Sequence, residues 1–209
     1  MKKKMDKLKE KIKANKQIII FLLGLTIVAI IFGAIFVTVL NKNDQTLVKD
    51  YLEQYLNNIK NNKLDYLVAF KNSFISNLIY ILTILILGIS IIGIPIMLFL
   101  FFTKSFILGF SISSIILNYK LKGCLLSFIY IFPHHIINIF LLILLVIYAF
   151  AFSIKIINAL FNKQTIDFKL ITNKYLTVLV ITIIGILITS LIEVFITPLI
   201  IKLLLPIIK

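Results

Sequence analysis

Few side chains in the long apolar stretches of this sequence could carry out chemistry. Lys104 falls near the middle of one apolar run, and Glu193 lies two thirds of the way along another. A charged side chain inside hydrocarbon is costly unless it reaches the surface or finds a partner, so such residues mark functional sites by default. The sequence leaves two interpretations open: an ion pair between Lys104 and Glu193, or two side chains that each reach a nearby surface.

The adjacent pair His134 and His135 is the next candidate for intramembrane polar chemistry. Neighbours on an α-helix point about 100° apart, whereas helical metal-binding pairs are spaced four residues apart. No Cys, Asp or Glu is near them in sequence, so a structural or polar-contact role is favoured over a metal site. No motif assembles a nucleophile, a base and an oxyanion hole, and none indicates a cofactor, so the chain is predicted not to be an enzyme.

The composition indicates whether these residues lie in water or in a lipid bilayer. Hydrophobic residues make up 61% of the 209 residues and charged residues only 14%, which excludes an ordinary soluble domain and a disordered chain. The chain is therefore predicted to be an integral membrane protein. The net charge of +14 comes entirely from lysine, whereas a nucleic-acid binder normally uses arginine for phosphate. Most lysines flank apolar runs, where they indicate topology.

The orientation follows from the first apolar run. Residues 1–16 contain eight lysines against two acids, and residues 17–40 contain no charge and form the first predicted span. Residues 41–73 contain five lysines against four acids. The positive-inside rule then predicts a cytoplasmic lysine-rich tail at 1–16 and an extracytoplasmic segment at 41–73.

The rest of the chain, 74–209, is predicted to form a membrane bundle. Its first apolar stretch, 74–118, is too long for one helix across roughly 30 Å of hydrocarbon, so a turn is predicted at Gly93 and Pro95. Pro133 is predicted to break or kink the next stretch, or to leave a short re-entrant piece before a full helix. The predicted spans are 74–92, 95–117, 124–152 and 176–201.

The fold class is thus an all-α polytopic helical bundle of about five transmembrane helices in the cell membrane, with the C-terminus outside. Six spans are the alternative if 124–152 crosses twice. The sequence also predicts a short extracytoplasmic amphipathic helix within 44–70, with an apolar stripe of Leu47, Tyr51, Tyr55, Leu56 and Ile59. This stripe packs either on the membrane and neighbouring spans or on an extracytoplasmic partner, for which Tyr51, Tyr55 and Ile59 are the candidates.

Several short segments carry a family resemblance. They are F-K-N-S-F at 70–74, L-G-I-S-I-I-G-I-P at 87–95, F-x-K-S-x-x-x-G-F from 102 to 110, and the S-F-x-x-x-x-P-H stretch from Ser127 to His134. With the lysine-rich tail, single span and external segment before them, they resemble stage II sporulation protein M of endospore-forming bacteria. In that family a Glu often follows the Pro-His pair, whereas this sequence has Asn138 at the comparable place, so no acidic role is expected there.

The resemblance implies a membrane scaffold of the engulfment machinery on the mother-cell side of the sporulation septum. Such a scaffold recruits two peptidoglycan hydrolases, an amidase/endopeptidase (stage II sporulation protein P) and a lytic transglycosylase (stage II sporulation protein D), for septal wall thinning. A homo-oligomer is compatible with this role. The alternative is a permease-like transporter subunit, in which Pro133 and Lys104 line a path, because broken helices can mark transport sites.

Overall fold

A computed structural model gives the backbone of residues 2–90, 92–162 and 167–208, and the side chains of 16–90, 92–131, 134–161 and 167–204. Within these residues the protein is all-α, as the sequence predicts. The elements are α1 (Lys2–Val39), α2 (Lys42–Lys60), α3 (Tyr66–Ile89), α4 (Gly93–Asn162), α5 (Phe168–Leu191), the π-helix η1 (Ile192–Ile196) and α6 (Thr197–Ile208).

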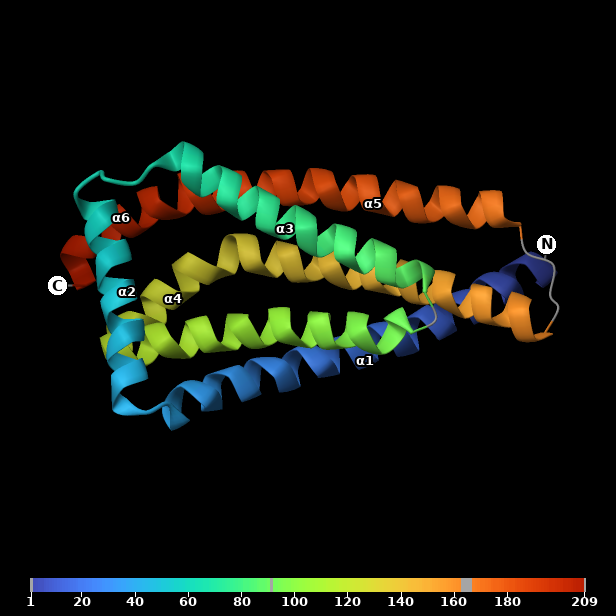
Figure 1. The fold of residues 1–209 in the computed structure, drawn as a ribbon, viewed down its shortest axis with the longest axis horizontal. Helices are drawn as coiled ribbons and strands as arrows, with labels where there is room; N and C mark the ends of the chain where they lie inside the picture. Colours follow the sequence, from blue (N-terminus) through green and yellow to red (C-terminus); the bar gives the residue numbers. More distant parts are fainter. Residues whose placement is uncertain (1, 91, 163–166, 209) are drawn as a thin grey trace.

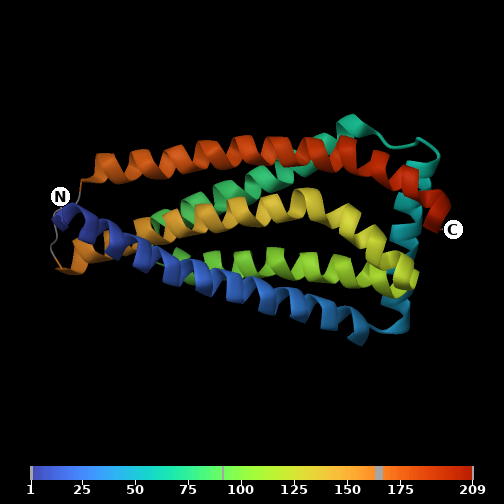
Figure 2. The ribbon, with the colours of Figure 1, turned by 180° about the vertical axis from the view of Figure 1, so that it is seen from behind.

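Helix α4 consists of two antiparallel legs. Lys120 adopts φ 53° and ψ −132°, which is not helical, and the chain reverses direction there (Figure 1). The first leg is 93–119 and the second is 121–162. Five stretches are long and apolar enough to cross a membrane, and they run side by side as α1, α3, the two legs of α4, and α5 with its continuation (Figures 1 and 2).

The two ends of the bundle differ in what they carry. The start of α1, the end of α4 and the start of α5 lie at one end, which we call the N-terminal end. Helix α2, the reversal at Lys120 and α6 lie at the other, which we call the α2 end (Figures 1 and 2). The second leg of α4 runs in one direction only, so the alternative in which 124–152 crosses twice does not hold, and the C-terminus lies at the α2 end.

Helix α3 begins eight residues before the predicted start of its span, because Asp65 caps it. The Asp65 carboxylate accepts the backbone N–H groups of Leu67 and Val68, each at 3.1 Å. A capping acid satisfies amides that a helix start leaves unpaired, which extends the helix into a polar stretch. The external segment between spans is therefore shorter than the predicted 41–73.

The turn between α3 and α4 lies before Gly93, not at Gly93 and Pro95. Helix α4 begins at Gly93, which places Pro95 in its first turn, where a missing N–H costs nothing. A Cβ on Gly93 would lie 1.9 Å from the Leu87 carbonyl oxygen, so the close return of the chain requires glycine.

The later span boundaries also move. The second leg of α4 is helical from 121 through 162, so the predicted break and the re-entrant piece at Pro133 do not hold, whereas the predicted kink fits the change of direction of the ribbon in its yellow stretch (Figure 1). The side chain of Pro133 lies outside the described residues. The span predicted at 176–201 begins at Phe168, where Asp167 accepts the Leu170 N–H at 3.1 Å, and ends in η1 and α6.

Helices α1 and α4 pack closely through two glycines. A Cβ on Gly33 would lie 2.1 Å from the Phe106 carbonyl oxygen, and one on Gly109 would lie 2.1 Å from that of Ile30. Ser113 Oγ also donates to the Ala34 carbonyl at 3.1 Å. Small residues let helix backbones approach where there is no hydrophobic force to drive association in lipid.

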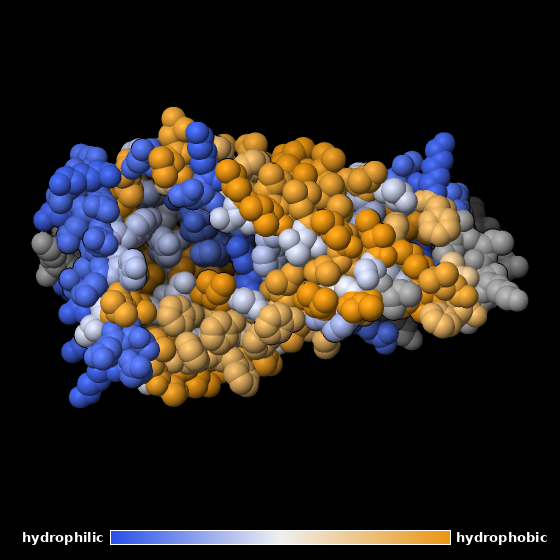
Figure 3. Space-filling view, viewed as in Figure 1, coloured by the Kyte–Doolittle hydropathy of each residue, from blue (hydrophilic) through white to orange (hydrophobic). Residues whose placement is uncertain are grey.

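Two apolar clusters fill the interior. The first, which we call the dry core, lies towards the N-terminal end and is built around side chains with no exposed surface: Ile81, Ile84, Met97, Phe101, Leu145, Val146 and Ala149. The second, the α2-end core, lies beneath α2 and comprises Leu56, Ile59, Leu108, Ile115, Leu126, Ile131 and Ile201. Outside, an apolar belt covers the middle of the molecule and hydrophilic side chains gather at both ends (Figure 3).

Candidate functional site

The structure places Lys104 against α3. Phe106, two residues later on the same helix, packs on Phe36 of α1 with ring centroids 5.6 Å apart, so Lys104 points to the opposite side. Its Nζ donates to Asn77 Oδ1 at 2.9 Å and lies 5.3 Å from the centroid of the Tyr80 ring. The lysine is therefore held inside the bundle by a hydrogen bond and a cation–π contact.

Glu193 also finds its partner on α3. Ser73 Oγ donates to Glu193 Oε2 at 2.7 Å, and Ser190 Oγ lies 3.1 Å from Ser73 Oγ. One hydroxyl hydrogen serves one short bond, so Ser190 donates to Ser73 while Ser73 donates to the carboxylate. Glu193 and Lys104 lie farther apart than the 4 Å of an ion pair, so of the two predicted interpretations the direct pair does not hold.

The backbone at Glu193 is irregular. Residues Ile192–Ile196 form a π-helical turn in which the Thr197 N–H bonds to the Ile192 carbonyl. Pro198 follows and has no N–H, so the turn has one carbonyl more than it has helical donors. Single π-turns inside α-helices are frequent at functional sites. Here the wide turn carries Glu193, whose carboxylate reaches Ser73 on α3.

The two histidines lie side by side on the second leg of α4. Their ring centroids are 4.3 Å apart, and the Tyr130 ring meets His134 edge-on at 6.0 Å. His134 is fully buried, and neither of its ring nitrogens has a partner in the described part of the chain. No cluster of three His, Cys, Asp or Glu side chains that could hold a metal occurs among the described residues.

A small cavity of about 20 Å³ lies between His135 and Lys104. His135, Lys104, Asn77 and Asn138 line it, and the Asn138 Oδ1 accepts the Thr189 hydroxyl at 2.6 Å. A cavity of this size holds about one water molecule. Four elements thus contribute polar groups to one point in the middle of the bundle.

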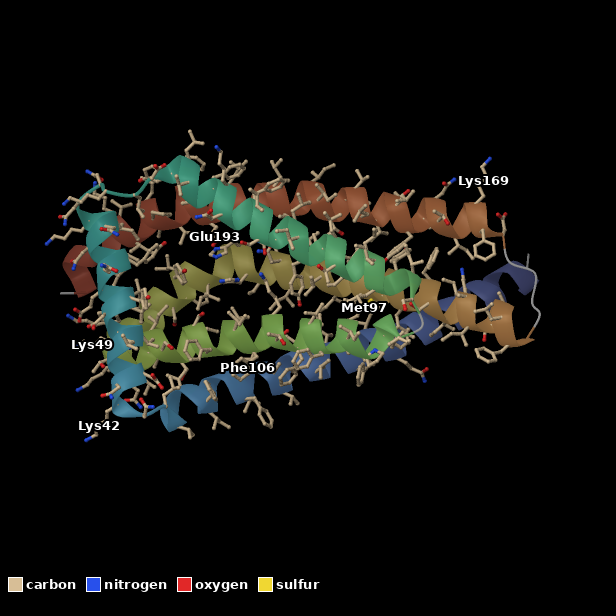
Figure 4. The ribbon with its side chains drawn as sticks, viewed as in Figure 1. Lys42, Lys49, Met97, Phe106, Lys169 and Glu193 are labelled. Atoms are coloured by element: carbon tan, nitrogen blue, oxygen red, sulfur yellow. The ribbon has the colours of Figure 1, made fainter. Side chains whose placement is uncertain are left out.

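A larger cavity of about 110 Å³ lies between this point and the α2 end. Its polar lining is Glu193 and the three tyrosines Tyr55, Tyr66 and Tyr130. The Tyr55 and Tyr130 rings meet edge-on at 5.7 Å, and Tyr66 stacks on Phe195 at 5.6 Å. Figure 3 shows a hollow with a hydrophilic floor on this face, and Figure 4 labels Glu193 at the same place in the same view.

The tyrosine hydroxyls of this cavity have unused hydrogen-bonding capacity. None of the three has a hydrogen-bond partner in the part of the chain that the structure describes. Burial raises the pKa of the Tyr55 hydroxyl above its ordinary value, and the neighbouring Tyr130 and the charge of Glu193 add to the shift. Tyr55 therefore stays protonated at neutral pH and presents both a donor and an acceptor to the cavity.

Helix α2 lies across the end of the bundle and divides the predicted docking residues. Ile59 is only 3% exposed and belongs to the α2-end core, so its predicted role in docking is wrong. Tyr55 faces inward to Tyr130 and the cavity. Tyr51 is 73% exposed on the outer face. The predicted apolar stripe places residues at intervals of four, whereas an α-helix has 3.6 residues per turn. Residues four apart therefore rotate gradually around the helix, and Leu52 faces inward where Tyr51 was expected.

Sequence reasoning missed the groups that satisfy the charged residues. Asn77 and Ser73 stand four residues apart on one face of α3, in an otherwise apolar span. Two polar residues at this spacing face the same way, which was a signal available in the sequence. Tyr66 and Tyr130 gave no such signal, because tyrosines are common at membrane interfaces.

Comparison with known proteins gives one match. The family model described as Stage II sporulation protein M matches residues 18–198, which include all five long helices and the candidate site. No curated protein and no solved structure matches the chain.

Proposed function

The chain belongs to the stage II sporulation protein M family, since the family model covers most of its length, and we propose that it is the non-enzymatic membrane scaffold of an engulfment complex at the septum. It is a sporulation-related, multi-pass membrane protein. The scaffold would recruit the septal peptidoglycan hydrolases of that machinery, the amidase/endopeptidase and the lytic transglycosylase.

Helix α2 is the observation that supports this role. Leu56 and Ile59 fix its inner face on the α2-end core, while Leu47 and Tyr51 are exposed on the outer face. The helix contains three lysines and three acids, and Lys49 and Glu53 pair at 3.6 Å on its surface. A firmly seated helix with a neutral outer face suits a protein partner better than a charged polymer.

The proposal requires the α2 end to be extracytoplasmic. The lysine-rich tail at the opposite end supports this orientation through the positive-inside rule. Asn58 is exposed on α2, so Asn58→Cys in a Cys124→Ser background should react with a membrane-impermeant maleimide in intact cells. The matched variant Phe168→Cys, at the N-terminal end, should react only after the cells are opened. The reverse labelling pattern would remove α2 from contact with wall enzymes.

Co-purification tests the scaffold itself. The detergent-solubilised chain should capture the two hydrolases, and the double variant Leu47→Ser/Tyr51→Ser should capture several-fold less. The matched control is Leu170→Ser/Phe168→Ser, which removes another exposed apolar pair, at the other end of the bundle, and should leave capture unchanged. An intact chain that captures neither enzyme would contradict the proposal.

The polar cavities are the one observation that favours the transporter alternative. They occupy the middle and the α2 end, whereas the dry core fills the N-terminal half with fully buried apolar side chains. A transporter needs a second state in which that core opens. Flux of a small solute through purified chain in liposomes, abolished by Lys104→Leu, would favour transport over a scaffold.

A further inference from the structure

We propose that the cavity at Glu193 binds the primary ammonium group of an aminophospholipid headgroup, such as that of phosphatidylethanolamine. The site consists of the Glu193 carboxylate and the three tyrosines Tyr55, Tyr66 and Tyr130 around about 110 Å³ of space. It is independent of the scaffold proposal, which rests on the outer face of α2.

The charge of the cavity selects a cation. Glu193 is its single charged side chain, and the hydrogen bond from Ser73 leaves the rest of the carboxylate's acceptor capacity open. Lys104 donates to Asn77 and forms no ion pair with Glu193. A carboxylate at membrane depth without a cationic partner is costly, so a cation supplied from outside would stabilise it.

The lining favours an ammonium group over a metal ion. Hard cations need six or more oxygen ligands, and one carboxylate with three phenols supplies too few. Aromatic faces around a carboxylate are the chemistry that recognises organic ammonium groups. An ammonium also has three donors, which the carboxylate and the tyrosine hydroxyls can accept.

The position of the opening favours a lipid over a soluble ligand. Figure 3 is viewed across the long axis of the bundle, and the hollow opens on this flank, between α2 and the apolar belt. A molecule entering there arrives sideways from the membrane, at the level where hydrocarbon meets headgroups.

A lysine follows the cavity-lining residue Pro198 by about one helical turn. This residue, Lys202, lies on α6 and is exposed, and its Nζ donates to Asn62 Oδ1 at 2.7 Å. Lys202 is thus the basic group that we assign to the lipid phosphate when the ammonium lies against Glu193.

Native mass spectrometry of the full-length chain in detergent tests this assignment. Added phosphatidylethanolamine should remain bound, and Glu193→Gln should weaken its binding about tenfold, the loss expected for one charge-assisted contact. The matched control Glu53→Gln removes an equal charge on the exposed side of α2 and should leave binding unchanged. Equal binding to wild type and Glu193→Gln would overturn the proposal.

Two further ligands test the chemistry on the wild-type chain, without any effect on folding. N-acetyl phosphatidylethanolamine keeps the acyl chains and phosphate but lacks the ammonium, and it should not be retained. Equal retention would show that acyl chains alone bind and would overturn the ammonium site. Free ethanolamine or a lysine-containing peptide that displaces the lipid at equal concentration would overturn the lipid assignment in favour of a soluble amine.

Discussion

The two halves of the bundle differ in their interiors: the N-terminal half is filled by apolar side chains, and the α2 half contains charged and polar ones. The N-terminal half is closed by the dry core, whose central side chains, such as Phe101 and Val146, have no exposed surface. The α2 half holds Lys104, Glu193 and His134, together with a cavity that opens on its flank. The same helices, α3 and α4, run through both halves.

The two halves differ because polar residues occupy only one part of the helices that run through both. On α3, Ser73 and Asn77 precede Ile81 and Ile84, so one helix face changes from polar to apolar along its length. The irregular backbone follows the same division, since the π-turn η1 lies in the polar half. Apolar packing therefore stabilises the N-terminal half, whereas hydrogen bonds position the polar and charged side chains of the α2 half. Variants that remove packing or hydrogen bonds separate these contributions.

The largest effect is expected in the dry core. Phe101→Ala should lower the free energy of unfolding by about 3–5 kcal/mol, because the emptied space lies among side chains that cannot collapse into it. Equilibrium unfolding in mixed micelles, with an increasing fraction of a denaturing detergent, measures this loss. Phe99→Ala, at a site 67% exposed on the same helix, is the control and should cost less than about 1 kcal/mol. Equal losses would mean that the N-terminal half is not tightly packed.

The second effect concerns how α2 is held on the polar half. Ile59→Ala should cost about 2–3 kcal/mol, since Ile59 is almost fully buried in the α2-end core, and it should make α2 sensitive to added protease. Tyr51→Ala is the exposed control on the same helix. If both variants are cut at the rate of wild type, α2 is not seated by its inner face.

The sequence allowed prediction of the part of the fold that depends on composition and helical periodicity. Apolar run lengths, lysine placement and the polar break near Lys120 gave five spans and a helix across one end. The partners of Lys104 and Glu193 could not be predicted in this way, because a hydrogen bond between helices depends on how α3 lies against α4 and η1. The sequence left open an ion pair or two side chains that each reach a nearby surface, whereas neutral Asn77 and Ser73 bind the two charged groups inside the bundle.

The same reasoning explains why the helix continues through Pro133. A proline removes one hydrogen bond, which predicts either a break or a kink when the sequence is considered alone. In the bundle the neighbouring helices support both sides of that point, so the leg bends and remains helical. The turn predicted at Gly93 and Pro95 lies a few residues earlier for a related reason, since a proline is tolerated in the first turn of a helix.

The third prediction tests the pairing in the middle of the bundle. Asn77→Leu should cost about 2 kcal/mol, because it leaves the buried Lys104 ammonium without its acceptor. The double variant Asn77→Leu/Lys104→Met should recover most of that loss, since replacing both partners with apolar groups removes the unpaired charge. Mixed-micelle unfolding of all four chains gives the coupling. Additive losses would show that Lys104 does not depend on Asn77.

The smallest effect is expected at Ser73, where one hydroxyl orients the Glu193 carboxylate. Ser73→Ala should cost about 1 kcal/mol, less than a fully buried bond to a charged group, because the carboxylate is partly exposed to the cavity. The loss should shrink in a Glu193→Gln background, since a neutral amide accepts a weaker bond than a carboxylate does. Ser73→Ala should also weaken phosphatidylethanolamine binding without unfolding the chain. An equal loss of unfolding free energy in both backgrounds would mean that Ser73 acts only through packing. The polar half would then be stabilised by side-chain packing, as the dry core is.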